Sequence, residues 1–166
     1  NLNQLTNESV SCFMVLTSSY KAQMEQTRKI VAKHLPNYNV VILNGDNTSN
    51  KQAEDFTNTA IADAHNKGLD GVIIIANQMG SRSYSIPEIQ ATVMAYDRGS
   101  VDASQQKVSR CLTPGKTFDK EIKQFGHIVD ISFDPNRSEN IESLLIDEII
   151  QTQKAKDIDF PTATSF

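Results

Sequence analysis

The segment Gly71-Val72-Ile73-Ile74-Ile75-Ala76 is the strongest β-strand signal in the chain. β-Branched side chains favour the extended backbone of a strand, and here they form an uninterrupted apolar run. Strands that are buried on both faces have this pattern, and they occur in parallel sheets whose two faces are covered. The segment therefore predicts an interior strand of a parallel β-sheet.

Apolar runs and segments of helical periodicity alternate on both sides of this strand. In chain order, we expect strands at Ser11–Thr17, Val40–Leu43, Gly71–Ala76, Thr92–Tyr96 and Ile128–Phe133, and helices at Ser18–Leu35, Asn50–Lys67, Ser104–Arg110 and Glu139–Gln153. Ser18 or Ser19 is expected to cap the first helix. The alternation predicts one α/β domain over residues 1–155, with a mainly parallel sheet and helices on both faces. Residues 156–166 are expected to form a flexible tail.

Length and composition restrict the class of protein. A chain of 166 residues fits a single hydrophobic core. No apolar stretch approaches the roughly 18–20 residues of a membrane span, so no membrane partner is expected. Cys12 and Cys111 lie far apart and form no metal-ligand or redox spacing. We therefore expect an intracellular protein, in the cytoplasm or associated with the nucleoid. Because the chain begins with Asn1, we interpret it as part of a longer protein.

Charge is distributed unevenly along the chain. The net charge of −4 argues against a dedicated nucleic-acid-binding domain, which is usually basic. Basic residues nevertheless gather in the central third, at Arg82, Arg98, Lys107, Arg110, Lys116, Lys120 and Lys123. This distribution predicts a local phosphate-facing patch, and solvated surface charge is the alternative interpretation.

Three loops are expected at the carboxyl ends of the strands, where open parallel sheets bind their ligands. They are Thr17–Ser19, Asn77–Pro87 and Asp97–Lys116. The second loop combines hydroxyl, amide and glycine residues with one guanidinium, a mixture that can form hydrogen bonds with phosphate oxygens and sugar hydroxyls. Taken alone, each loop also fits an ordinary surface connection.

In their order along the chain, these segments resemble the second RecA-like lobe of superfamily 2 helicases and translocases. Ser11–Ser19 resembles motif IV, and Gly71–Pro87 followed by Thr92–Asp97 resembles motif V. Gln106–Thr113 resembles motif VI, whose usual form is Gln-x-x-Gly-Arg-x-x-Arg. The resemblance extends over Ser11–Phe133 and implies a three-layer RecA-like fold.

The resemblance implies a nucleic-acid contact at three residues. Thr17 and Ser18 match motif IV positions that touch the phosphate backbone, and Asn77 falls where the motif V threonine does so. DNA is the expected track rather than RNA, because motif VI has the Gln-x-x-x-Arg form. Such contacts read phosphates rather than bases, so binding is expected to depend on salt and little on sequence.

The resemblance also implies a set of nucleotide-facing residues. Arg82 matches the motif V arginine that joins the lobes around the nucleotide, and Ser85 falls where an aspartate contacts the ribose. Gln106 matches the first position of motif VI, and Arg110 matches its first arginine, which reaches the triphosphate and is the expected catalytic residue. Thr113 replaces the second arginine of motif VI. Ser83 and Ser109 replace the glycines of motifs V and VI, and Ser85 replaces the motif V aspartate.

The chain has no phosphate loop of the form Gly-x-x-x-x-Gly-Lys-Ser/Thr and no Asp-Glu pair after an apolar strand. ATP with Mg²⁺ is therefore expected to be held mainly by an N-terminal RecA-like lobe outside this sequence, and this chain alone is expected to be inactive. His34, His65 and His127 have no ligand spacing, so no metal site is expected within it.

Two other functions compete with a helicase. A non-catalytic nucleic-acid or protein binding module derived from such a lobe is favoured by the replaced motif residues. A flavodoxin-like enzyme is the more distant reading, because Thr17–Ser19 is a poor substitute for a phosphate-binding glycine loop.

Overall fold

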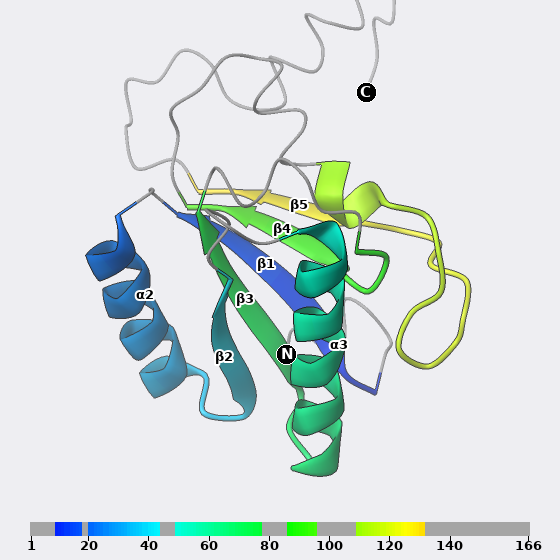
Figure 1. The fold of residues 1–166 in the computed structure, drawn as a ribbon, viewed down its shortest axis with the longest axis horizontal. Helices are drawn as coiled ribbons and strands as arrows, with labels where there is room; N and C mark the ends of the chain where they lie inside the picture. The colour runs from blue at the N-terminus through cyan, green and yellow to red at the C-terminus, as the bar shows by residue number, and fades with distance from the viewer. Residues whose placement is uncertain (1–8, 18–19, 44–48, 78–85, 96–108, 132–166) are drawn as a thin grey trace, which may run out of the picture. The chain divides into compact units, whose positions relative to one another are not determined.

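The computed structural model describes residues 9–17, 20–43, 49–77, 86–95 and 109–131. The chain divides into two compact units, Asn1–Ile131 and Ser132–Phe166, and every described element belongs to the first unit (Figure 1). The helix expected at Glu139–Gln153 and the tail expected at 156–166 lie outside the described residues.

Five parallel strands form one sheet in the order β2-β3-β1-β4-β5. They are β1 (Ser11–Thr17), β2 (Tyr38–Leu43), β3 (Gly71–Asn77), β4 (Ala91–Met94) and β5 (His127–Asp130) (Figure 1). All seven residues of β3 are buried, and β1 and β2 flank this strand. The expected interior strand of a parallel sheet is therefore confirmed.

Helix α2 (Lys21–His34) covers one face of the sheet. Val31 from α2 and Leu35 from its C-terminal cap pack against a buried cluster on that face. The cluster consists of Phe13, Tyr38, Ile73 and Ala91, which come from four different strands. Because the helix and four strands share this cluster, its burial holds the sheet together on the α2 face.

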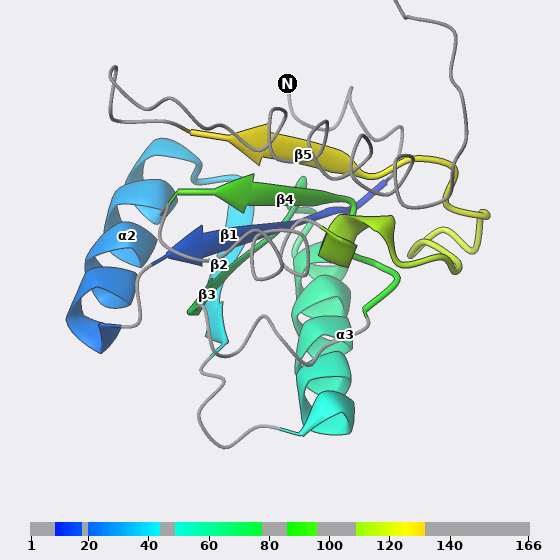
Figure 2. The same ribbon diagram turned by 90° about the horizontal axis from the view of Figure 1, so that it is seen from above.

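Helix α3 (Asn50–Asn66) covers the opposite face. Asn39 follows Tyr38 in β2, so its side chain points to the other side of the sheet, where its Nδ2 donates to the Ala60 carbonyl of α3 at 3.2 Å. Ser49 and Gln52 form a capping box that fixes the start of the helix. The expected α/β fold with helices on both faces is thus confirmed (Figures 1 and 2).

One local expectation was wrong, and a second can be compared with the structure only at its C-terminal end. Helix α2 begins at Lys21, and its N-cap is Tyr20, which forms no side-chain capping hydrogen bond, so neither Ser18 nor Ser19 is the cap. At the described end of the helix expected over 104–110, the chain forms a short 3-10 helix, η3 (Ser109–Leu112). Pro114 has no N–H with which to close an α-helical turn, and the Thr113 N–H donates to the Arg110 carbonyl instead.

Replacing Ile74 tests whether burial of β3 stabilises the fold. Ile74 is fully buried in β3, so Ile74→Ala should lower the free energy of unfolding by about 3 kcal/mol through lost apolar contact and a residual cavity. Urea unfolding followed by circular dichroism measures this change. Ile30→Ala on the exposed side of α2 is the matched control and should stay within about 0.5 kcal/mol of the parent. Equal losses in the two variants would contradict the assignment of β3 as the core strand.

Candidate functional site

Two polar residues end neighbouring strands at the carboxyl edge of the sheet. Thr17 is the last residue of β1 and Asn77 is the last residue of β3, and the two are register partners. Thr17 is only 6% exposed, and Asn77 is only 2% exposed. The Thr17 hydroxyl donates to the Ala76 carbonyl at 3.4 Å, a long and therefore weak hydrogen bond. The structure thus places two of the three residues that are expected to contact nucleic acid side by side.

The connections around this edge leave the sheet in opposite directions. Helix α2 follows β1 and covers one face, whereas α3 follows β2 and covers the other face. Strand β3 lies between β1 and β2. Open parallel sheets bind their ligands outside the carboxyl ends of the strands. Thr17 and Asn77 therefore occupy the position where this class of fold binds ligands.

The amino end of α2 adds a positive field to the same edge. A helix N-terminus carries partial positive charge from its aligned peptide dipoles. Lys21 is exposed in the first turn, and this turn contains no acidic residue. Together with the hydroxyl of Thr17, these groups favour an anion such as a phosphate.

Arg110 lies at the other end of the strands. Gly126, which directly precedes β5, is so close to η3 that a Cβ at this position would lie 2.1 Å from the Cys111 carbonyl oxygen. Segment η3 therefore packs against the amino end of β5 (Figure 2). The structure does not bring Arg110 together with Thr17 and Asn77.

Lys123 fixes the segment that contains η3 to the start of β4. Its Nζ donates to the carbonyls of Pro87 and Ile89 at 2.9 and 3.0 Å. Gly115 also packs against Pro87, because a Cβ on Gly115 would lie 2.4 Å from the proline Cβ. In the sequence, Lys123 is one basic residue among several in the central third, since no local pattern identifies a lysine whose partners are distant backbone carbonyls.

The guanidinium of Arg110 is half-buried, and burial lowers its pKa. Arginine nevertheless keeps its charge at neutral pH. A planar cation that has lost part of its hydration is well suited to bind a phosphate group, because the anion restores favourable charge interactions. Its expected contact with a triphosphate stays a prediction.

The remaining expected site residues, Ser18, Arg82, Ser85 and Gln106, lie outside the described residues. Their expected roles stay predictions.

Comparison with known proteins assigns no family. No protein-family model matches the chain, and no curated protein matches it. Among the described helices, none combines the length and apolar character that a membrane crossing requires.

The buried Cys12 thiol should make the free energy of unfolding fall at alkaline pH. Burial, reinforced by the negative charge of Glu88 and partly offset by Lys123, raises the pKa of this thiol above its ordinary value of 9.0. The folded state therefore retains a proton that the unfolded state releases, so the free energy of unfolding should fall as the pH rises above about 9. Urea unfolding at about pH 8 and about pH 10 measures this fall. Cys12→Ala should show a smaller fall than the parent, and equal falls would contradict the prediction.

Proposed function

We propose that this domain is the C-terminal RecA-like lobe of an ATP-dependent nucleic-acid helicase or translocase, acting on DNA rather than RNA. In this role it grips the strand backbone and completes an ATP cleft whose other wall is an N-terminal RecA-like lobe of the same protein. The observation that carries the proposal is the pairing of Thr17 with Asn77 at the carboxyl edge of the sheet, beside the amino end of α2.

This edge offers the chemistry of a phosphate contact. A hydroxyl and an amide can each donate a hydrogen bond to a phosphate oxygen, and such contacts carry no base information. The Thr17 hydroxyl, which donates to the Ala76 carbonyl at 3.4 Å, lies beside Asn77 at this edge. The positive field of α2 and the charge of Lys21 favour the same ligand.

Arg110 supports a separate nucleotide contact. It lies at the opposite end of the sheet from Thr17 and Asn77, so in this proposal it contacts the nucleotide and not the nucleic-acid backbone. In this proposal its guanidinium stabilises negative charge that spreads over phosphate oxygens during transfer. ATP with Mg²⁺ would be bound mainly by the other lobe, and the cleavage of its terminal phosphate would drive closure and opening of the cleft.

The second candidate is a non-catalytic nucleic-acid or protein binding module derived from such a lobe. Thr113 favours it, because this residue carries no charge at the position of the second motif VI arginine. The two candidates share the strand-binding edge and differ in whether Arg110 contributes to hydrolysis.

Removing the Thr17 hydroxyl tests the strand contact. We expect the chain to bind a fluorescent thymidine oligonucleotide, and to bind about tenfold more weakly when salt rises from about 50 to about 200 mM. Thr17→Val should weaken binding about tenfold, because it removes one hydrogen bond to a charged group. Fluorescence anisotropy measures both effects. The control is Thr59→Val, which removes an exposed α3 hydroxyl that donates to Asp55. If the two variants bind alike, Thr17 does not contact the strand.

Replacing Arg110 distinguishes the two candidate functions. In a protein that carries both this domain and the lobe with the phosphate loop, Arg110→Ala should lower kcat for ATP hydrolysis on the order of a thousandfold. Arg110→Lys should restore little, because a lysine lacks the planar fork of donors. A steady-state phosphate-release assay measures these rates. Unchanged hydrolysis in Arg110→Ala would favour the non-catalytic module.

A further inference from the structure

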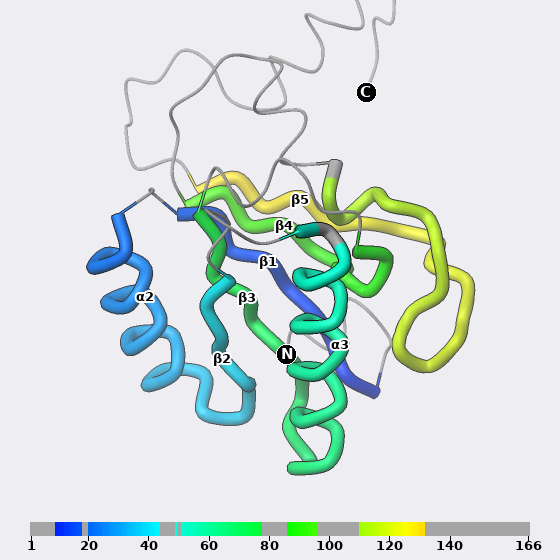
Figure 3. Tube along the Cα trace, in the orientation of Figure 1, coloured from blue at the N-terminus to red at the C-terminus, as the bar shows by residue number. Residues whose placement is uncertain are grey.

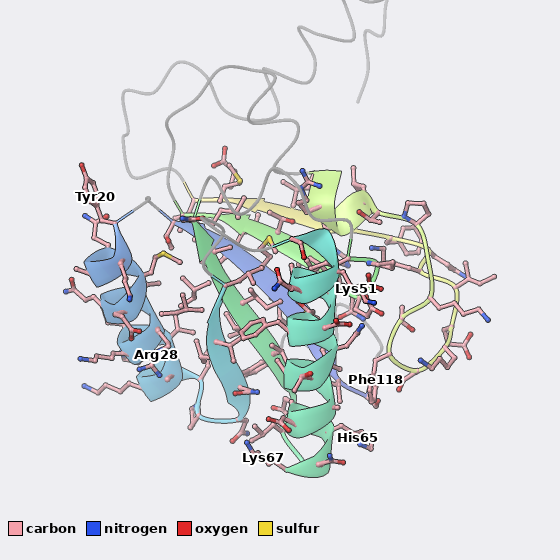
Figure 4. The ribbon with its side chains drawn as sticks, in the orientation of Figure 1. Tyr20, Arg28, Lys51, His65, Lys67 and Phe118 are labelled. Atoms are coloured by element: carbon pink, nitrogen blue, oxygen red, sulfur yellow. The ribbon has the colours of Figure 1, made fainter. Side chains whose placement is uncertain are left out.

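Tyr20 presents an aromatic ring to solvent at the carboxyl edge. It follows Thr17 by three residues and is the N-cap of α2. The residue is 69% exposed, and Figure 4 shows its side chain pointing outward from the amino end of this helix. An exposed ring of this size leaves a large apolar area in water, and a ligand that covers it gains the corresponding hydrophobic stabilisation.

The backbone of Tyr20 is fixed although its ring is exposed. Its carbonyl accepts hydrogen bonds from the N–H groups of Gln23 and Met24 at 2.9 and 3.1 Å. The residue adopts an extended conformation, with φ −81° and ψ 117°. Because the Cα position is set by the helix, a ligand that stacks on the ring has to order only the side chain itself.

The surroundings of the ring suit a nucleotide better than an apolar protein partner. Lys21 is adjacent, and the first acidic residue of the helix, Glu25, is paired with Arg28 at 3.0 Å. Ile30, the exposed aliphatic residue of α2, lies ten positions further along, which is about 15 Å in a helix. The ring is therefore distant from the other exposed large apolar side chain of this helix and lies next to a positive charge.

From these observations we propose that the Tyr20 ring stacks on an unpaired base of the strand whose phosphates contact Thr17 and Asn77. This inference rests on the proposed strand-binding role and names its substrate class as single-stranded nucleic acid. In a duplex, both faces of each interior base are covered by neighbouring base pairs. An exposed ring can stack only on a base that has left such a stack.

Oligonucleotide binding by ring variants tests the stacking. Tyr20→Ala should bind a thymidine oligonucleotide of about 20 residues about tenfold more weakly than the parent, whereas Tyr20→Phe should bind like the parent. Phe125→Ala is the matched control, because this ring is 74% exposed but precedes the amino end of β5. The same-length abasic oligonucleotide keeps the phosphates and lacks the bases, so Tyr20→Ala should bind it as the parent does.

A fluorescent reporter gives a second readout that does not depend on affinity. The chain contains no tryptophan, so Tyr20→Trp introduces a single indole at the proposed contact. Its emission should be quenched by the thymidine oligonucleotide and remain unchanged with the abasic one at equal occupancy.

The results separate this inference from the proposed function. If the parent binds both oligonucleotides equally and Tyr20→Ala changes neither affinity, stacking is overturned while the phosphate grip stands. Equal emission of the introduced indole with both oligonucleotides also overturns stacking. If the parent binds neither oligonucleotide, the strand-binding role fails and the inference fails with it.

Discussion

The register between β1 and β3 is the constraint on which the rest of the structure depends. Gly71 begins β3 where β1 approaches closely, and a Cβ there would lie 2.2 Å from the Ser11 carbonyl oxygen. From this pair the two strands run in step until Thr17 meets Asn77. A slip of one residue would turn the side chains of a strand toward the wrong face. The same shift would separate the two polar residues at the carboxyl edge, so core packing and site geometry share one cause. Figure 3 shows the neighbouring courses of β1 and β3.

The two ends of the sheet differ in how polar groups are accommodated. At the amino end, polar side chains hold backbone together: Gln90 accepts from the Cys12 N–H at 3.0 Å, and Lys123 donates to two carbonyls near β4. These bonds satisfy buried groups and fix the segment that carries Arg110. At the carboxyl end, the Thr17 hydroxyl donates to the Ala76 carbonyl at 3.4 Å, and the N-cap residue of α2 forms no side-chain capping hydrogen bond. The long-range contacts of Gln90 and Lys123 thus join distant segments at the amino end, whereas the proposed ligand contacts lie at the carboxyl end.

Much of the fold was predictable, because local sequence patterns carry it. The run at Gly71–Ala76 predicted a doubly buried strand, and Ser11–Thr17 matched β1 at both ends. The expected end of α3 also held, since Gly68, just beyond its cap, adopts φ +64°. The error concerned the start of α2. The serines before α2 were good caps by type, yet the helix began one residue beyond Tyr20.

The candidate site was less predictable than the fold. Thr17, Asn77 and Arg110 were singled out by resemblance, but their chemistry depends on neighbours that are distant in the chain. The three residues lie far apart in the chain, and no local pattern indicates which of them meet at the same edge of the sheet. Ser18, Arg82, Ser85 and Gln106 lie outside the described residues, so their roles remain predictions.

The amino-acid sequence by itself determined that this is a parallel α/β domain, because apolar runs and helical periodicity depend on residues close together in the chain. Only the tertiary structure decided the strand order, the meeting of Thr17 with Asn77, the position of Arg110 at the other end of the sheet and the anchoring of Lys123. These features depend on which distant strands pair, and that choice is made by the burial and hydrogen bonding of the whole sheet at once.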